Sequence, residues 1–285
     1  SITRKEKHNA KVVIISEKNE YNHLLDEVKS FKPLVIGFSS VSSQFNYVKE
    51  MAALIKKLFP SITIICGGVH PTINTDALLE TEMINGFFVG ESEFSIVEFL
   101  NKIEKGESFK EIDNFAYVQN GVVVRNKLKS LIENLDLLPH PDKEIYPYKK
   151  TIMDLGYAPF FFARGCPYMC TYCSNHALAG LYGRKRNYPR FRSPEMCIRE
   201  IEEVMGKYGK LIEFVWIMDD IFGLNNKWRE EFCGKYKSRI KKKFMILIRV
   251  EMANDSFFDM LKDAGCFKVF FGVESGNEKV RSKIM

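Results

Sequence analysis

The stretch YAPFFFARGCPYMCTYC, residues 157–173, joins an apolar run to a loop that holds three cysteines. An apolar run of this length favours a buried β-strand, and the glycine and proline that follow favour a loop. Cys166, Cys170 and Cys173 therefore lie in one CxxxCxxC loop directly after a predicted strand. Thiols this close in sequence suit a metal or a metal cluster better than a framework of disulfides.

Residues 151–285 alternate strand-like and helix-like segments, beginning near that run. Capping signals precede the helices, as at Ser193-Pro194-Glu195, where a capping serine is followed by a first-turn proline and an early acid. Four β-α units in a row predict the first part of a parallel (β/α) barrel, whose active site lies at the carboxyl ends of the strands. The predicted strands are YAPFFFAR (157–164), FVWIMDD (214–220), FMILIRVE (244–251) and KVFFGVES (268–275). Charged residues at or near these strand ends are Asp219, Asp220, Arg249 and Glu274.

Residues 11–103 alternate short apolar runs with amphipathic segments. Strands that are apolar throughout and separated by helices predict a parallel sheet covered on both faces, which is a doubly wound, Rossmann-like α/β domain. The runs are KVVIIS (11–16), PLVIGFSS (33–40), ITIICGG (62–68) and NGFFVGE (85–91). Ligands bind beyond the carboxyl ends of such strands, where small and hydroxylated residues allow close approach to the backbone. The candidates there are Ser39, Ser40, Ser42, Gly67, Gly68, His70 and Gly90.

Two further segments define the domain organisation. FAYVQNGVVVRN (115–126) has alternating apolar residues on both sides of Asn120-Gly121, which predicts a β-hairpin. The proline-rich, polar segment that follows is typical of a connector. We therefore expect an α/β domain with a hairpin over residues 1–133, a linker over 134–150 and the barrel units over 151–285. Because the chain starts at Ser1 and stops inside a predicted helix, we expect it to be truncated at both ends.

Composition restricts the class of protein. With 46% hydrophobic residues in 285, the chain has ample material for buried cores. Its net charge of +6 is spread along the chain without regularly spaced aromatic residues, so we expect no nucleic acid partner. The apolar runs are far shorter than the roughly 18 residues of a membrane span, and the N-terminus has no signal-peptide pattern. We therefore expect a cytoplasmic protein with no membrane span.

Two metal centres are compatible with the three-cysteine loop. A structural zinc site needs four ligands, so a zinc alternative would recruit His176 as the fourth. A [4Fe-4S] cluster held by three thiolates instead leaves one iron open for chemistry, and a loop at the mouth of a barrel suits it. No second cysteine pair follows the loop, so the spacing favours the cluster.

RGCPYMCTYC (164–173), with an aromatic residue before its last cysteine, resembles the radical S-adenosylmethionine (SAM) superfamily. FVWIMDDIFGLN, IRVE and FGVESG extend the resemblance to the subfamily with an N-terminal cobalamin-binding domain. The resemblance implies that the three cysteines hold a [4Fe-4S] cluster and that SAM binds the open iron and is cleaved to a 5′-deoxyadenosyl radical. It implies SAM contacts at Tyr172, Arg249 and Glu274, and at Asp219 and Asp220, where many relatives carry a glycine-glycine-glutamate motif.

For the first domain, the resemblance implies that cobalamin lies against the seven strand-end residues from Ser39 to Gly90. No histidine stands in the Asp-x-His-x-x-Gly motif whose histidine ligates cobalt in classical cobalamin domains. His70 is therefore expected to be a neighbour of the cobalamin rather than an axial ligand.

The resemblance favours a methyltransferase in which methylcobalamin delivers a methyl group to a substrate radical. The alternatives are an oxidative cyclase like the anaerobic magnesium-protoporphyrin monomethyl ester cyclase, and a cofactor-binding module without turnover. The implied partners are a small-molecule, lipid or natural-product substrate and an electron donor such as flavodoxin or ferredoxin.

Overall fold

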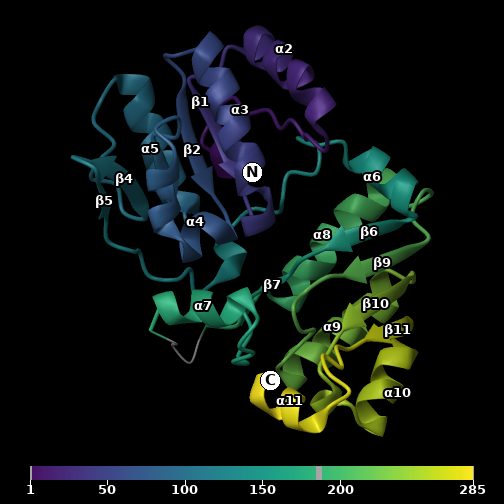
Figure 1. Cartoon of the computed structure of the whole chain (residues 1–285). Helices are drawn as coiled ribbons and strands as arrows, with labels where there is room; N and C mark the ends of the chain where they lie inside the picture. Colours follow the sequence, from purple (N-terminus) through teal and green to yellow (C-terminus); the bar gives the residue numbers. More distant parts are fainter. Residues whose placement is uncertain (1, 184–187, 285) are drawn as a thin grey trace. The chain divides into compact units, whose positions relative to one another are not determined.

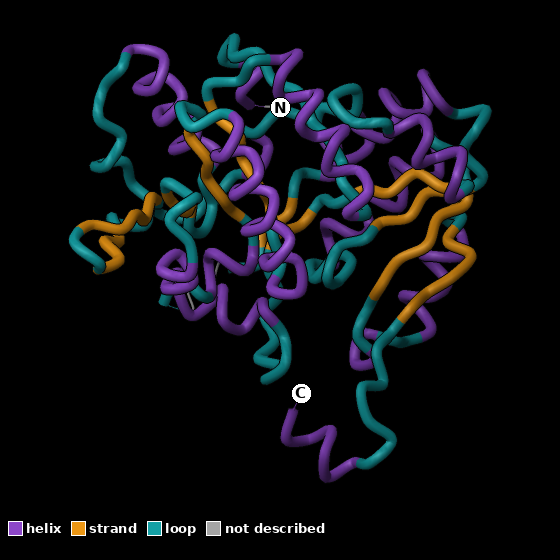
Figure 2. Tube along the Cα trace, turned by 45° about the horizontal axis from the view of Figure 1, so that its top comes forward, coloured by secondary structure: helices purple, strands orange, loops and turns teal. Residues whose placement is uncertain are grey.

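The computed structural model describes residues 2–183 and 188–284. The chain divides into two compact units, Ser1–Leu131 and Ile132–Met285 (Figure 1). Each unit is built on its own β-sheet, and the strands are drawn in orange in Figure 2. Among the described residues, no helix is both long enough and apolar enough to cross a membrane.

The first unit contains a five-stranded sheet with the strands in sequence order. β1 (Val35–Ser39), β2 (Thr63–Gly67) and β3 (Gly86–Phe88) are parallel, whereas β4 (Phe115–Gln119) and β5 (Val122–Arg125) add to the sheet in antiparallel fashion. The helical elements are α1 (Ile2–Lys5), η1 (Lys18–Glu20), α2 (Tyr21–Phe31), η2 (Ser42–Gln44), α3 (Phe45–Leu58), α4 (Val69–Ile73), η3 (Thr75–Glu80) and α5 (Glu93–Lys105).

Helices cover both faces of this sheet. Ile64 and Cys66 of β2 belong to a buried cluster with side chains of α2 and α3, whereas Ile65 packs with Phe99 of α5 in a separate cluster. Successive residues of a strand point to opposite faces, so the two clusters lie on opposite sides of the sheet. The prediction of a doubly wound α/β domain is therefore confirmed.

The hairpin prediction is also confirmed, because β4 and β5 pair on either side of Asn120 and Gly121. Both residues have positive φ angles, 53° and 75°, as a two-residue type I′ turn requires.

The strand predicted at residues 11–16 is wrong. In the structure, residues 11–16 belong to no helix or strand. Val13 and Ile15 pack against the core of the first unit, while Val12 and Ile14 are 37% and 54% exposed. The alternation therefore reflects a segment without β-pairing that covers the core with every second side chain.

The second unit contains a parallel four-stranded sheet in the order β11-β10-β9-β6. These strands are β6 (Tyr157–Phe160), β9 (Phe214–Ile217), β10 (Lys243–Leu247) and β11 (Cys266–Phe270). β7 (Ala163–Arg164) pairs separately with β8 (Arg190–Phe191). The helical elements are η4 (Leu135–Leu137), α6 (Tyr148–Leu155), α7 (Ser174–Leu181), α8 (Pro194–Tyr208), α9 (Asn226–Arg239), η5 (Val250–Met252), α10 (Asp255–Asp263) and α11 (Glu278–Ile284).

Strand and helix alternate in this unit as the sequence predicts, so the partial (β/α) barrel is confirmed. Side chains of α8, α9 and α10 form one buried cluster with one face of the sheet, including Phe160, Ile217 and Phe244. The predicted cap is present, since Ser193 Oγ accepts a hydrogen bond from the backbone N–H of Met196.

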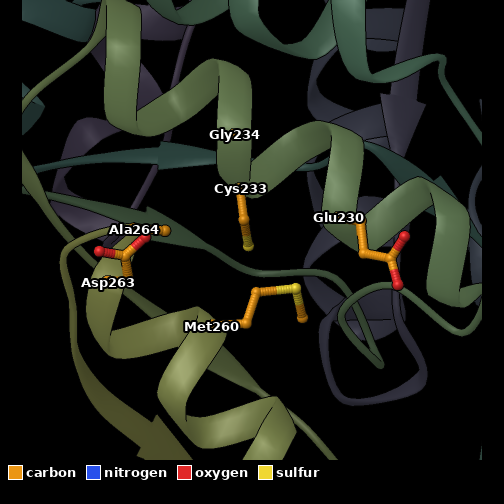
Figure 3. Close-up of a pocket in the computed structure, with 6 residues that line it drawn as sticks. All are labelled: Glu230, Cys233, Gly234, Met260, Asp263 and Ala264. Atoms are coloured by element: carbon orange, nitrogen blue, oxygen red, sulfur yellow. The ribbon is translucent and has the colours of Figure 1, made fainter.

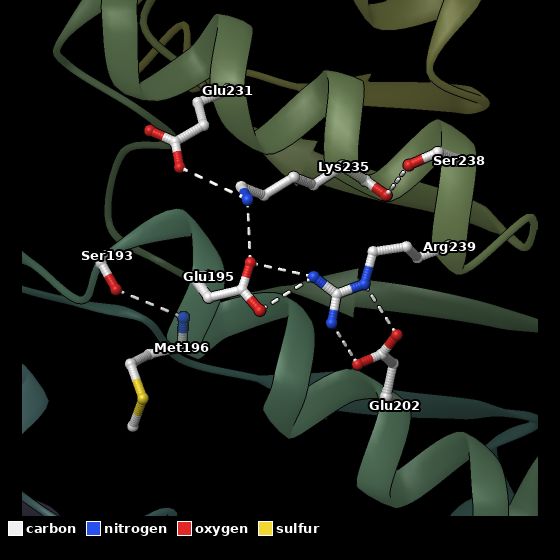
Figure 4. Close-up of polar contacts among 8 residues, drawn as sticks. All are labelled: Ser193, Glu195, Met196, Glu202, Glu231, Lys235, Ser238 and Arg239. Carbon is white, nitrogen blue, oxygen red and sulfur yellow. Dashed lines mark hydrogen bonds and ion pairs between the residues drawn. The ribbon is translucent and has the colours of Figure 1, made fainter.

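An ion-pair network joins α8 to α9 on the outside of this unit (Figure 4). Arg239 Nη1 donates to both carboxylate oxygens of Glu195 at 2.9 Å, and its Nε donates to Glu202 at 2.8 Å. Lys235 Nζ also donates to Glu195, at 2.8 Å. The hydrogen bonds from Lys235 and Arg239 lower the pKa of Glu195 to about 2. The network therefore ties together the two helices that cover the centre of the sheet.

Candidate functional site

The cysteine loop starts where β7 ends. Gly165, immediately before Cys166, has a φ of +82°, and a Cβ placed on it would lie 2.6 Å from the Tyr188 ring. Only glycine fits this backbone without strain, so the turn into the loop depends on it. Cys166, Cys170 and Cys173 are all free and partly exposed.

Arg249, just after β10, contacts the middle of this loop. Its Nη1 donates to Cys170 Sγ at 3.5 Å, and its Cζ lies 3.9 Å from the centre of the Tyr168 ring. The other edge of the guanidinium donates to Glu251, from Nε at 3.1 Å and from Nη2 at 2.7 Å. The Glu251 carboxylate raises the pKa of Arg249, so the guanidinium beside the cysteine stays charged.

Tyr172 and Glu274 also meet beside Cys170. The pKa of Tyr172 is raised to about 12. Desolvation is the main cause, and a hydrogen bond to the Glu274 carboxylate is the second. Cys170 also lies within hydrogen-bond reach of the Tyr172 hydroxyl and contributes to the same shift. Glu274 has a φ of +61° in the segment after β11. The structure thus brings together Cys170, Tyr172, Arg249 and Glu274, from three separate parts of the chain.

The two aspartates after β9 have different environments. Asp219 is only 2% exposed, and its Oδ1 accepts hydrogen bonds from the backbone N–H groups of Phe162 at 2.6 Å and Ala163 at 2.9 Å. Burial raises the pKa of Asp219 to about 7. Asp220 is exposed and accepts a hydrogen bond from Asn175 Nδ2 at 2.9 Å. Asp219 therefore braces the start of the cysteine loop, and Asp220 is the carboxylate that a ligand could reach.

The donor set of the loop fits a [4Fe-4S] cluster, because three free, partly exposed thiols lie within one short segment of the chain. Burial raises the pKa of Cys166, as do the nearby Asp220 carboxylate and the other two cysteines. In residues 2–183 and 188–284 no three His, Cys, Asp or Glu side chains already lie at metal-binding positions, so a cluster would have to draw the sulfurs together. His176, the zinc alternative, has its Nδ1 3.0 Å from the Met169 carbonyl oxygen.

In the first unit, hydrogen bonds tie the ends of β1, β2 and β3 together. Ser40 N donates to the Gly67 carbonyl at 2.9 Å, and His70 N donates to the Ser40 carbonyl at 3.0 Å. Gly68 has a φ of +99°, and a Cβ there would lie 2.8 Å from the Ser40 carbonyl oxygen. Backbone hydrogen bonds therefore join Ser40, Gly67 and His70 at the carboxyl ends of β1 and β2, the edge at which ligands bind α/β sheets. Such an edge fits a large flat ligand such as cobalamin.

Thr72 is a member of this edge that the sequence analysis did not identify. It is buried, its Oγ1 donates to the Gly68 carbonyl at 2.7 Å and it accepts from Gly90 N at 3.1 Å. It thereby links the ends of β2 and β3. The only signal in the sequence was its place within GGVHPT.

His70 is 7% exposed and packs against Phe45 with the two rings tilted by 38° and their centroids 4.5 Å apart. Its Nδ1 lies 3.0 Å from Ser42 Oγ, and its buried Nε2 has no partner among the described residues. A cobalt ligand must present a nitrogen at the surface of the site, so this burial is consistent with a neighbouring role for His70.

A shallow pocket of about 270 Å³ lies between α9 and α10 (Figure 3). None of the candidate site residues lines it. Its lining consists of Glu230, Cys233, Gly234, Met260, Asp263 and Ala264.

Comparison with known families identifies both units. Residues 160–285 match the radical SAM superfamily, and residues 3–100 match the B12 binding domain. The chain therefore combines a B12-binding domain with a radical SAM domain. A radical SAM domain implies a [4Fe-4S] cluster and SAM, and a B12-binding domain implies cobalamin.

Three known proteins are similar to most of this chain. The uncharacterized methyltransferase PH0819 of Pyrococcus horikoshii is 27% identical over 97% of this chain and 59% of its own length. The anaerobic magnesium-protoporphyrin IX monomethyl ester cyclase of Rubrivivax gelatinosus is 24% identical over 88% of this chain and 45% of its own. The structure of the cobalamin-dependent radical enzyme OxsB, with aqua-cobalamin and SAM bound, superposes with a TM-score of 0.74 at 21% identity, covering 93% of this chain and 38% of OxsB. The chain thus spans about half the length of the curated relatives it matches.

Proposed function

We propose that this chain belongs to a cobalamin-dependent radical SAM methyltransferase and carries its cofactor-binding machinery. The observation that carries the proposal is the grouping of Cys170, Tyr172 and Glu274 at the carboxyl ends of parallel strands, with Cys166 and Cys173 in the same loop. The name of the Pyrococcus relative supports methyl transfer in particular.

We assign the residues to three roles. The three cysteines would hold the cluster, and Tyr172, Asp220 and Glu274 would bind and orient SAM, with Asp219 bracing the loop from below. The tied strand ends of the first unit, from Ser39 to Gly90, would bind cobalamin. When bound, the cluster supplies the electron that cleaves SAM, and cobalamin supplies a carrier for the methyl group.

A partly exposed aromatic face of the second sheet supports a substrate with an apolar or planar portion. Tyr157 stacks on Phe214 with ring centroids 5.2 Å apart, and Trp216 stacks on Phe270 at 5.9 Å. These side chains lie on the face away from the buried cluster, because β6 and β9 alternate. We infer a small-molecule, lipid or natural-product substrate, together with flavodoxin or ferredoxin as the electron donor. Because electron donors of this kind are cytoplasmic proteins, we infer that this protein is cytoplasmic as well.

An oxidative cyclase is the second candidate, favoured by the match to the Rubrivivax enzyme. The two functions differ in what becomes of SAM. Methyl transfer through cobalamin releases S-adenosylhomocysteine as well as 5′-deoxyadenosine, whereas a cyclase releases 5′-deoxyadenosine alone.

The test is anaerobic reconstitution with iron, sulfide and cobalamin, followed by reduction with titanium(III) citrate in the presence of SAM. The proposal predicts that both 5′-deoxyadenosine and cobalamin-dependent S-adenosylhomocysteine form. 5′-Deoxyadenosine without S-adenosylhomocysteine would favour the cyclase. Bound cofactors with neither product would refute both enzymes in favour of a binding module without turnover.

A further inference from the structure

The guanidinium of Arg249 is engaged on three sides. Its side chain is 13% exposed, and both Nε and Nη2 are directed at Glu251. The remaining nitrogen, Nη1, donates to Cys170 Sγ, and the face of the guanidinium lies over the Tyr168 ring. A planar fork held in this way by a carboxylate has a fixed orientation.

We propose that Arg249 is a positioning residue of the cluster: it fixes the cysteine loop by stacking on Tyr168, and it raises the reduction potential of the cluster through its hydrogen bond to the Cys170 sulfur. This inference rests on the proposed function, since it requires a cluster at the three cysteines. It replaces the SAM contact that the sequence predicts for Arg249.

The physical basis is the charge on the sulfur. Reduction adds one negative charge to the cluster, and part of that charge is borne by the thiolates. A cationic N–H donor at Cys170 stabilises the reduced form more than the oxidised form, and hydrogen bonds to sulfur are known to tune cluster potentials. Glu251 opposes this effect, because its negative charge partly neutralises the guanidinium.

The two side chains therefore have opposite effects on the potential. Removing the Arg249 charge should make the cluster harder to reduce, and removing the Glu251 charge should make it easier to reduce. A purely structural role in the loop would not produce shifts of opposite sign.

The experiment compares Arg249→Gln, Arg249→Lys and Glu251→Gln with wild type in anaerobic redox titrations followed by electron paramagnetic resonance. Iron content and the affinity for SAM are measured on the same samples. Arg239→Gln is the matched control, because Arg239 is also paired with carboxylates in the second unit but binds α8 instead of the loop.

For Arg249→Gln we expect the ratio of reduced to oxidised cluster at a fixed potential to fall about tenfold, because one hydrogen bond to a charged group is lost. This corresponds to a reduction potential about 59 mV lower for a one-electron couple. Glu251→Gln should shift the potential upward, Arg249→Lys should lie between Arg249→Gln and wild type, and Arg239→Gln should not move it. If Arg249→Gln takes up too little iron to titrate, the upward shift in Glu251→Gln decides the question.

Unchanged reduction potentials in both Arg249→Gln and Glu251→Gln would overturn the inference. A large loss of SAM affinity in Arg249→Gln, at an unchanged potential, would instead support the SAM contact that the sequence predicts for Arg249. Neither result touches the proposed function, provided that wild type binds a cluster and cleaves SAM. Failure of wild type to bind iron would instead refute the proposed function itself.

Discussion

Asp219 offers a sharp test of how the cysteine loop is supported. Its Oδ1 accepts hydrogen bonds from the backbone of Phe162 and Ala163, and burial raises its pKa to about 7. The ordinary pKa of an aspartate is close to 4. Between about pH 4 and pH 7 the folded state therefore holds a proton that the unfolded state has released, so the free energy of unfolding should fall as the pH rises.

Three pH units correspond to about 4 kcal/mol, at about 1.4 kcal/mol for each unit. The loss should be complete slightly above pH 7. Asp219→Asn keeps an acceptor for the two N–H groups but has no titrating carboxyl group. The variant should therefore lack the fall in the free energy of unfolding that Asp219 causes between about pH 4 and pH 7. Asp219→Ala leaves two buried donors without their acceptor and should lose about 2–4 kcal/mol at pH 5.

The assay is urea unfolding of the metal-free protein at several pH values, followed by tryptophan fluorescence. Trp216 and Trp228 are the two tryptophans of the chain, and both lie in the second unit, so the signal reports on the unit that contains Asp219. The reasoning would be refuted if wild type and Asp219→Asn had parallel pH profiles between pH 4.5 and pH 7.

Three further predictions concern single side chains of the second unit. Gly165→Ala should reduce iron uptake because its Cβ would meet the Tyr188 ring at 2.6 Å. Gly183→Ala should not, because Gly183, with a φ of +68°, has no neighbour within 4 Å among residues 2–183 and 188–284. Equal uptake by the two variants in reconstitution assays would contradict this prediction. Arg239→Gln should lower the urea midpoint slightly, and less so in 0.5 M salt, because the ion pairs of Arg239 with α8 are partly exposed and are screened by salt. A lower midpoint that persists in high salt would indicate a loss of packing instead. Cys170→Ala should abolish 5′-deoxyadenosine formation and leave cobalamin binding nearly intact, with Cys266→Ala as the cysteine control; loss of both functions together would show that the two cofactor sites are not separate.

The periodic parts of the fold could be predicted from the sequence. The β-α units of the second unit are long and strongly patterned, and Asn120-Gly121 fixes its hairpin by local conformation alone. The segment at residues 11–16 has the same apolar character as a strand, yet whether it pairs depends on a neighbour that the local sequence does not specify.

The division of roles between the two aspartates follows from strand parity. Val215 and Ile217 of β9 belong to the buried core. Asp219, two residues after Ile217, continues this buried row, whereas Asp220 is exposed. This signal was present in the sequence. The contact of Arg249 with Cys170 was not, because it joins residues 79 positions apart and depends on where β10 ends relative to the loop.

We propose that the three-cysteine loop holds an iron-sulfur cluster in a chain that also binds cobalamin. The most direct measurement is anaerobic reconstitution followed by a visible spectrum and by iron, cobalt and zinc counts on the desalted protein. We expect about four irons and one cobalamin per chain. Zinc bound at the cysteines, with no uptake of iron, would contradict it.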